Sequence, residues 1–295
     1  MNWKHYLVAT TIDEALAALA ASAGPACPVG GGTDLLLEIQ QGHHAPVDTL
    51  VDVTHIPELT RLEIQEGRLF IGAGVPVADV AESALVWAHA SAICEACALI
   101  GGPQVRNTAT LGGNVAHALP AADGMISLVA MDAEVEIASL NGRRRAPILS
   151  LFRGPGQSTL EPAKEFLVGF WLEMRLASQG SGFSRVMRPQ GVALPILNMA
   201  AWIERDGEHV RAARVAVGPA GPTPQRIRAV EEFLGGCVFN GANLDAAVEV
   251  WETSMRFRTS PQRATAEYRK HLSGVLLSGV MEKAWQRTFE PALEA

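Results

Sequence analysis

The chain has 295 residues, of which 48% are hydrophobic, enough for more than one packed domain without disulfide bridges. Its formal charge of −7, from 24 basic and 31 acidic residues, argues against nucleic acid as a partner. No apolar run approaches the roughly 20 residues that span a bilayer, no signal peptide is recognisable, and the four cysteines are scattered, so we expect a cytoplasmic protein without a membrane span.

The N-terminal part alternates between helices and strands. Apolar residues recur at helical spacing from Thr11 to Ala21, and Thr11 can cap the helix. A short strand is expected to end at Val29, after which Gly30 to Asp34 turns the chain into an apolar helix from Leu35 to Gln40. A buried strand follows from Thr49 to Val53.

The middle section is predicted to be α+β. Its expected elements are, in chain order, a hairpin from Arg61 to Gly72 with Glu66-Gly67 at the turn, a helical stretch opened by Pro76, an Ala-rich helix from Ala84 to Ile100 that ends at Gly101-Gly102-Pro103, a helix from about Ala121 to Met131, a strand from Glu134 to Ala138 before an Asn141-Gly142 turn, and a strand from Phe166 to Met174.

The last part of the chain reads as a small sheet backed by helices. Ser178 to Gly182 is rich in Ser, Gly and Gln, which predicts a linker or crossover before it. The expected strands and helices are Ile196 to Ile203, Val210 to Gly218, Thr223 to Leu234, Leu244 to Arg256 and Ala266 to Trp285.

Two glycine-rich turns carry the main chemical signal. Backbone N–H groups without Cβ atoms in the way can wrap an anionic oxygen, and a helix that begins just after them adds the positive end of its dipole. Gly30-Gly31-Gly32-Thr33 before the helix at Leu35 meets both conditions. Thr110-Leu111-Gly112-Gly113-Asn114 is expected to supply further N–H groups, a hydroxyl and an amide. Together the two turns predict a site that holds one diphosphate from two sides.

Other readings of these turns were weighed. Gly30 to Gly32 alone fits equally well a plain strand-to-helix turn capped by Thr33 or Asp34. The G-x-G-x-x-G spacing of a Rossmann fingerprint is absent, because Gly72-Ala73-Gly74 is followed by Val75-Pro76, and no Gly-Lys-Ser/Thr of a Walker loop is present. The common nucleotide-binding folds are therefore disfavoured.

The order and spacing of several segments resemble the medium, FAD-binding subunits of the xanthine dehydrogenase and carbon monoxide dehydrogenase (molybdenum hydroxylase) family. The resemblance covers nearly the whole chain, and the segments that carry it are Val29 to Leu36, Asp48 to Leu59, Ile71 to Gly74, Gly102 to Asn114, Pro120 to Asp123, Phe152 to Gly156, Phe166 to Val168 and Arg263 to Arg269.

The resemblance implies an α+β fold: a two-lobed FAD-binding domain of the vanillyl-alcohol-oxidase (PCMH) type in residues 1–176, with lobes of about 1–57 and 58–176, and a small α+β C-terminal domain in residues 177–295. It also implies which residues bind FAD. The stretches Val29, Gly30, Gly31, Gly32, Thr33, Asp34 and Thr110, Leu111, Gly112, Gly113, Asn114 would line the diphosphate, Asp123 would bond a polar part of the cofactor, and Phe166, Leu167, Phe183 and Arg185 would lie near the flavin. For Asp34, whose carboxylate should avoid phosphate, we expect a contact through its N–H or with a ribose hydroxyl.

The sequence departs from the family pattern in one place beside the flavin. Where some relatives place an aromatic residue or a lysine next to the ring, the matching stretch here is Gly191-Val192-Ala193-Leu194-Pro195, which leaves open how the flavin face is shielded. The cysteine-rich insert that holds an extra iron-sulfur cluster in some relatives is not present.

Other chemically suggestive residues have ordinary interpretations. Cys94 and Cys97 fit two small core residues on one helix face, and His43 and His44 fit a solvated loop, so no metal site and no catalytic residue is predicted. The basic run Arg143-Arg144-Arg145 follows a hairpin turn and is expected to face water, with a docking patch as the alternative. For His117, close to the second turn, a structural role and a functional role remain equal alternatives.

The sequence therefore predicts an oxidoreductase subunit that carries electrons through FAD. By resemblance, its partners would be a small subunit with two two-iron two-sulfur clusters and a large subunit with molybdenum and molybdopterin cytosine dinucleotide, in a dimer of heterotrimers that delivers electrons to NAD, oxygen or another acceptor. A stand-alone FAD oxidoreductase and a non-enzymatic nucleotide-binding protein are the alternatives.

Overall fold

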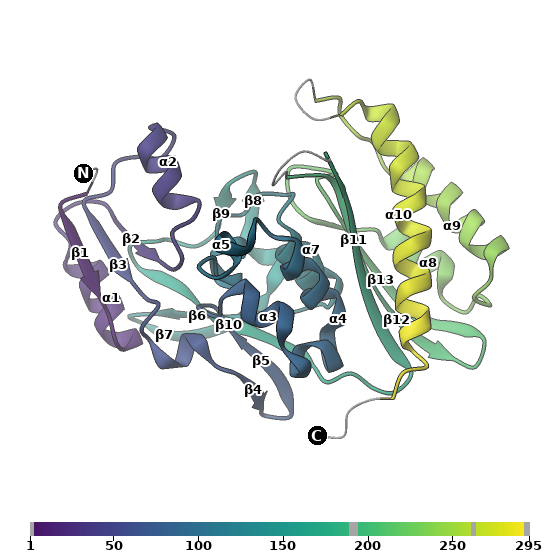
Figure 1. Ribbon diagram of the computed structural model, residues 1–295, viewed down its shortest axis with the longest axis horizontal. Coiled ribbons are helices and arrows are strands. Elements are labelled where there is room, and N and C mark those ends of the chain that lie inside the picture. Colours follow the sequence, from purple (N-terminus) through teal and green to yellow (C-terminus); the bar gives the residue numbers. More distant parts are fainter. Residues whose placement is uncertain (1–2, 189–193, 261–263, 292–295) are drawn as a thin grey trace.

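Three main sheets and the helices packed on them make up the molecule. The computed structural model describes residues 3–188, 194–260 and 264–291. A small N-terminal sheet, a five-stranded central sheet and a four-stranded C-terminal sheet follow one another along the chain, and Figure 1 shows them arranged in that order along the long axis. The predicted α+β class is confirmed.

The N-terminal lobe is a parallel sheet in the order β1-β3-β2. Its strands are β1 (His5–Val8), β2 (Ala26–Val29) and β3 (Thr49–Asp52), and its helices are α1 (Ile12–Ala21) and α2 (Leu35–Gln41). Thr11 caps α1 by accepting the N–H of Glu14, as its position before the apolar periodicity predicted. β2 ends at Val29, so the first glycine segment leaves the sheet at the carboxyl end of a parallel strand.

The central sheet is antiparallel and is buried on both faces. Its order is β4-β5-β10-β6-β7, with β4 (Leu62–Gln65), β5 (Arg68–Gly72), β6 (Glu134–Ser139), β7 (Gly142–Pro147) and β10 (Glu165–Glu173). Successive side chains point to opposite faces: Phe70 and Trp171 pack with the helix α1 side, whereas Leu69 and Phe170 pack with the central helices. The N-terminal lobe therefore shares a core with this sheet.

The central helices cover the other face of that sheet. They are α3 (Val77–Glu82), α4 (Ala84–Leu99), α5 (Pro103–Arg106), α6 (Leu111–Ala116) and α7 (Asp123–Ala130), with 3-10 turns at Pro57–Thr60 and Ile148–Leu151 and a small ribbon of β8 (Phe152–Gly154) and β9 (Gln157–Ser158). Cys94 and Cys97 lie in this core, and burial raises the pKa of Cys94 to about 12 and that of Cys97 well above its usual range. The prediction that they are core residues is confirmed.

The C-terminal sheet is antiparallel in the order β11-β12-β13-β14, with β11 (Gln179–Met187), β12 (Pro195–Asp206), β13 (His209–Gly218) and β14 (Gln225–Arg226). On β12, Met199 and Ile203 face the C-terminal helices, and Ala200 and Trp202 face the central core. The same alternation fastens this sheet to both of its neighbours.

The C-terminal helices are α8 (Arg228–Leu234), α9 (Gly241–Ser254) and α10 (Ala266–Arg287). Figure 1 shows α10 running along the outer face of the β11–β13 sheet. No helix in the described ranges, α10 included, combines the length and the apolarity needed to cross a membrane.

The prediction of a linker at Ser178 to Gly182 is wrong, because β11 begins at Gln179. A Cβ on Gly180 would lie 2.2 Å from the backbone oxygen of Ala284 on α10, and Ser181 Oγ accepts the N–H of Ala92 at 3.2 Å. Small residues are needed here because a helix crosses the strand closely, and this requirement produces a composition that resembles a linker.

The basic run Arg143 to Arg145 on β7 is neutralised by neighbouring glutamates. Arg143 pairs with Glu58, and Arg145 pairs with Glu66 at 3.0 Å while its guanidinium lies 3.9 Å from the centre of the Trp171 ring. Arg144 pairs with a carboxylate as well, at 3.1 Å. The run is exposed to water, as expected, but it offers no unpaired basic patch for docking.

Candidate dinucleotide-binding site

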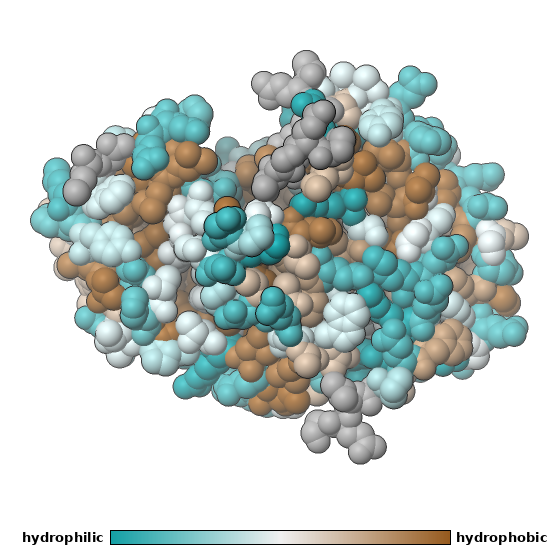
Figure 2. Space-filling view, in the orientation of Figure 1, coloured by the Kyte–Doolittle hydropathy of each residue, from teal (hydrophilic) through white to brown (hydrophobic). Residues whose placement is uncertain are grey.

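A large cavity lies where the three parts of the chain meet. Its volume is about 1980 Å³, and its walls come from the β2–α2 connection, the segment from Ile100 to Asp123, the β8–β9 ribbon, strand β10 and the C-terminal domain. Figure 2 shows the surface hollowed between the α2 region and the C-terminal domain. Most small-molecule pockets hold about 300–1,000 Å³, so this cavity suits a ligand as long as a dinucleotide.

The first glycine segment, Gly30 to Asp34, presents unused backbone donors to this cavity. All five residues line it, and none of their N–H groups donates to an acceptor within the described part of the chain. Buried or half-buried amides that lack a protein partner are expected to bind water or a ligand. Gly32 adopts a φ of 67°, a conformation that glycine takes without strain.

The two glycine segments lie against each other, as their proposed shared ligand requires. A Cβ on Gly31 would lie 1.9 Å from the backbone oxygen of Thr108, and one on Gly30 would lie 3.0 Å from Thr110 Oγ1. Glycine is therefore required at position 31 because the chain from the central domain passes directly behind it. The prediction that the two segments converge is confirmed.

The second segment does not use its backbone as predicted. Leu111 donates its N–H to Val75 O at 3.2 Å, Gly112 to Ala73 O at 2.9 Å, and Asn114 to Thr110 O at 3.0 Å. These residues form the first turn of α6 rather than an open loop, and the N–H of Gly113 is taken by the capping hydroxyl of Thr110. The expectation of a second row of free amides is wrong.

Leu111 and Gly112 do not line the cavity at all. Leu111 is fully buried, and a Cβ on Gly112 would lie 2.5 Å from the backbone oxygen of Ala73. Gly112 is thus a packing residue that lets α6 approach the β5 connection. Both residues support the site from behind instead of facing a ligand.

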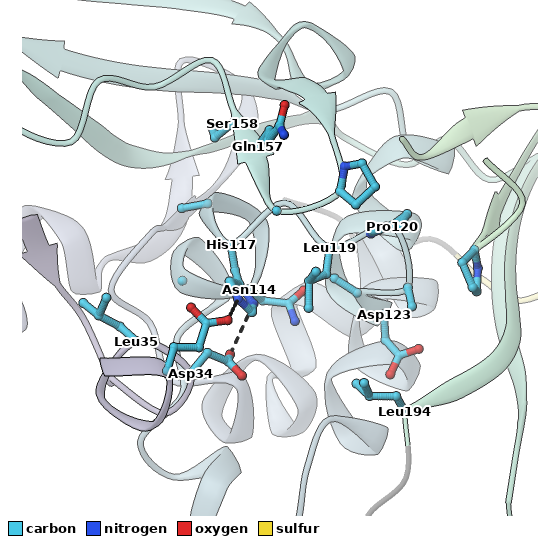
Figure 3. Close-up of a pocket in the computed structure, with 18 of the residues that line it drawn as sticks. Asp34, Leu35, Asn114, His117, Leu119, Pro120, Asp123, Gln157, Ser158 and Leu194 are labelled. Carbon is cyan, nitrogen blue, oxygen red and sulfur yellow. Dashed lines mark hydrogen bonds and ion pairs between the residues drawn. The ribbon is translucent and has the colours of Figure 1, made fainter. Parts of the chain in front are cut away.

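Side chains are what the second segment offers to a ligand. Thr110, Gly113 and Asn114 line the cavity. Asn114 accepts the N–H of Met125 through Oδ1 at 3.2 Å, which leaves its NH₂ group without a protein acceptor among the described residues. Figure 3 shows the Asn114 side chain in the pocket between His117 and Leu119. Its NH₂ group and the Thr110 hydroxyl are donors available to an anionic ligand.

His117 joins the second segment to helix α2. Its Nε2 lies 2.9 Å from Glu38 Oε1 and its Nδ1 lies 3.7 Å from Asp34 Oδ2, and Figure 3 shows both contacts. The imidazole therefore holds the carboxylates of Asp34 and Glu38 together at one end of the cavity. This arrangement gives His117 a structural contact on the site wall and keeps the Asp34 carboxylate engaged.

A buried ion pair stands at the opposite end of the segment from Ile100 to Asp123. Asp123 and Arg185 form a short hydrogen-bonded pair, and Asn198 Nδ2 donates to the other oxygen of Asp123 at 2.6 Å. Burial raises the pKa of Asp123, while the guanidinium of Arg185 and the amide of Asn198 oppose that rise. Arg185 Nε has no hydrogen-bond partner among the described residues. The pair is a polar feature buried at the wall of an otherwise apolar region.

Asn198 is a site residue that sequence reasoning missed. It is fully buried on β12, in the run Ile196 to Ala201 that is otherwise apolar. A buried amide needs a polar partner, so its position among apolar neighbours was the signal that could have marked it.

The residues predicted near the flavin separate into two groups. Phe166, Leu167 and Arg185 line the cavity, whereas Phe183 does not. Phe183 lies further along β11, in the core that includes α4, and its N–H donates to Glu95 on that helix at 2.8 Å. The prediction that Phe183 lies at the ligand is therefore wrong.

The stretch that departs from the family pattern is only partly visible. Gly191, Val192 and Ala193 lie outside the described residues, but Leu194 and Pro195 line the cavity. Their apolar side chains form part of its wall on the C-terminal side, and Figure 3 shows Leu194 close to Asp123.

The donor set suits a dinucleotide and not a metal. Within the described ranges no group of three or more His, Cys, Asp and Glu side chains could hold a metal ion, although His43 and His44 both line the cavity. Free amides beside two neutral side-chain donors fit a diphosphate, and Phe166 and Leu167 with Leu194 offer apolar surface to a ring system. An FAD molecule, with both groups in one ligand, matches these residues.

Family models match both parts of the chain. Residues 2–172 match a model described as the FAD binding domain in molybdopterin dehydrogenase, and residues 182–284 match the CO dehydrogenase flavoprotein C-terminal domain. Among named relatives, the xanthine dehydrogenase FAD-binding subunit of Escherichia coli O157:H7 is 31% identical over 87% of each chain. The nicotine 6-hydroxylase medium subunit of Paenarthrobacter nicotinovorans is 31% identical over 88% of this chain and 90% of its own.

A solved structure supports the same relationship. Carbon monoxide dehydrogenase from Hydrogenophaga pseudoflava, in a form that lacks the Mo-pyranopterin moiety of its molybdenum cofactor, superposes with a TM-score of 0.89 at 27% identity. The match covers 96% of this chain and 98% of the matched chain, so the fold is shared from the N-terminal lobe to α10.

Proposed function

Because the chain belongs to the FAD-binding subunits of the molybdopterin dehydrogenase family, it is an FAD-dependent oxidoreductase subunit, and we propose how it holds the cofactor and which partners it serves. The resemblance stated from the sequence is thereby confirmed, together with FAD as the cofactor of this chain. The stand-alone oxidoreductase and the non-enzymatic binding protein are disfavoured, because the named relatives are subunits of dehydrogenases and hydroxylases.

The FAD diphosphate binds at the first glycine segment. The single observation that carries this proposal is the row of free amides from Gly30 to Asp34, which faces the cavity without a protein acceptor in the described part of the chain. Thr110 and Asn114 donate from the opposite side through side chains. The proposed contact residues are those predicted positions that line the cavity: Val29, Gly30, Gly31, Gly32, Thr33, Asp34, Thr110, Gly113, Asn114, Asp123, Phe166, Leu167 and Arg185.

The ring system of FAD lies toward the C-terminal domain in this proposal. Phe166 and Leu167 on β10 and Leu194 before β12 supply apolar surface there. FAD brings the redox chemistry, since a flavin can take up electrons singly or in pairs, and the protein binds and orients it. Arg185, held by Asp123 and Asn198, places a fixed positive charge and a free Nε donor at this end.

The partners follow from the family. We propose a small subunit with two two-iron two-sulfur clusters and a large subunit with molybdenum and molybdopterin cytosine dinucleotide, in a cytoplasmic dimer of heterotrimers. Electrons would pass from the clusters through this chain to NAD, oxygen or another acceptor. Within the chain, we propose that residues 1–176 form the FAD-binding domain, with lobes of about 1–57 and 58–176, and residues 177–295 the C-terminal domain.

Purification from the native host tests this proposal. The expected result is a yellow complex in which this chain elutes with two partner subunits and FAD is released on denaturation. A yellow protein that elutes alone and oxidises a small substrate would favour the stand-alone enzyme. A colourless protein that takes up no added FAD would contradict the cofactor site.

A further inference from the structure

The cavity extends beyond the proposed FAD contacts into the C-terminal domain. There its wall is formed by the β13–β14 connection, the segment after α9 and the start of α10. The FAD contacts proposed above account for the wall from the first glycine segment to Arg185, and they leave this end of the cavity without a ligand.

An extended segment presents two arginines to this end. Arg256, Phe257 and Arg258 follow α9 in extended conformation, so the two arginines share one side and the phenylalanine takes the other. Phe257 packs on the C-terminal core, with its ring 6.1 Å from that of Trp251, and does not line the cavity. Arg256 and Arg258 both line it. The anchoring of Phe257 thus turns both guanidinium groups toward the cavity.

The charges in the cavity are unevenly distributed. At the α2 end, Asp34 and Glu38 are engaged by His117, and in the middle Asp123 is paired with Arg185. No carboxylate among the described residues lines the end formed by the C-terminal domain, where Arg256 and Arg258 are joined by the buried Arg269 of α10. Arg256 and Arg258 form no ion pair with any described residue. Three guanidinium groups therefore leave an uncompensated positive charge in a concave site.

Guanidinium groups in a fixed arrangement favour phosphate, which they bind bidentately. Resting on the proposed function, we propose that Arg256, Arg258 and Arg269 bind the diphosphate of a second, soluble nucleotide that enters the cavity beside FAD as electron acceptor. The volume of about 1980 Å³ exceeds what one ligand normally fills, so both molecules have room.

Calorimetric titration of the purified FAD-containing complex with NAD tests this site by binding rather than by turnover. The wild-type complex is compared with the double variant Arg256→Gln/Arg258→Gln and with the double variant that carries lysine at both positions. Arg211→Gln is the matched control, because Arg211 is an exposed arginine of the same domain outside the cavity. Inorganic phosphate is titrated as a second probe.

The expected result is a Kd for NAD that rises about tenfold or more in the glutamine variant, rises less in the lysine variant and is unchanged in Arg211→Gln. FAD content should be equal in all four complexes. Equal NAD affinity in the glutamine variant, no NAD binding by the wild type, or phosphate binding as tight as that of NAD would overturn the proposal. So would loss of FAD from the glutamine variant, because the arginines would then belong to the FAD site. Failure of the proposed function would show separately, as a wild-type preparation without flavin or partner subunits.

Discussion

Two glycine-rich segments lie side by side in this molecule, yet they do different work. In Gly30 to Asp34 the backbone N–H groups are free and face the cavity. In Leu111 to Asn114 the N–H groups are bonded within the fold, and Gly112 is needed because Ala73 lies where its Cβ would be.

The comparison teaches that glycine has two separate uses at a cofactor site. One glycine segment exposes donors to a ligand, while the other lets two backbones approach so that the first is held in place. A glycine motif therefore marks where backbone comes close to something, but it does not say whether that neighbour is ligand or protein.

The largest expected effect separates the two segments directly. In Gly31→Val, the new side chain starts 1.9 Å from Thr108 O, so the two segments must move apart and the amides no longer converge. Loss of at least two charge-assisted hydrogen bonds, at about 1.5–3 kcal/mol each, should lower FAD affinity by about 100-fold or more. Flavin fluorescence quenching measures this affinity.

The control for this variant is Gly241→Val. A Cβ on Gly241 meets no atom within 4 Å, and this glycine lies at the start of α9, away from the cavity. FAD affinity should stay at the wild-type value there. An unchanged affinity in Gly31→Val would remove the first segment from the site.

Gly112→Ala should act on the fold more than on the ligand. Its Cβ would lie 2.5 Å from Ala73 O, and overpacking of this kind costs about 1–3 kcal/mol of unfolding free energy. Urea unfolding of the FAD-free protein measures that loss. If Gly112→Ala instead kept its stability and lost FAD, the second segment would contact the diphosphate after all.

Asn114→Asp tests the side-chain donors of the second segment. Aspartate keeps an oxygen for the N–H of Met125 but replaces the cavity-facing NH₂ with an anionic oxygen. Repulsion from the diphosphate should weaken FAD binding by about tenfold or more. Equal FAD affinity in the variant and the wild type would mean that Asn114 is turned away from the phosphates.

Thr110→Ala should have a smaller effect on both properties. The hydroxyl caps α6 through the N–H of Gly113, and loss of such a cap costs about 0.5–2 kcal/mol. FAD affinity should fall modestly as the same hydroxyl leaves the cavity, and Thr110→Ser should restore both values. If serine failed to restore FAD affinity, the methyl group and not the hydroxyl would be the contact.

The smallest effect concerns cysteine reactivity on the two sides of the site. Cys27 lines the cavity just before the first segment, and burial raises its pKa to about 11, whereas Cys94 and Cys97 lie in the core behind the second. Because the thiolate is the reactive form, alkylation of Cys27 in FAD-free protein should be slow at neutral pH and should accelerate until pH approaches about 11.

Peptide mass spectrometry follows that alkylation residue by residue. Bound FAD should slow the reaction at Cys27, and Cys94 and Cys97 should react after unfolding. Alkylation of Cys27 that is equally fast with and without FAD would place the cofactor elsewhere in the cavity.

Local patterns in the sequence predicted most of the elements. Thr11 before an apolar helical repeat, Glu66-Gly67 between two apolar runs and the alternation in Val210 to Gly218 each depend on neighbours in sequence, and the structure has the helix, the hairpin and the strand. The position of the site at the two glycine segments was predictable for the same reason.

Contacts between distant segments could not be predicted in this way. The linker expected at Ser178 to Gly182 is a strand because α10 crosses it, and the second row of free amides is absent because Ala73 and Val75 accept two of them. The Asp123 partners Arg185 and Asn198 come from two strands of another domain. Each of these features depends on a residue far away in sequence.

Hydrogen exchange measured by mass spectrometry on the FAD-free and FAD-loaded protein tests the central comparison most directly. The account predicts fast amide exchange at residues 30–34 without FAD and strong protection with it, while residues 112–114 are protected in both states. Unchanged exchange at residues 30–34 together with new protection at residues 112–114 would contradict it.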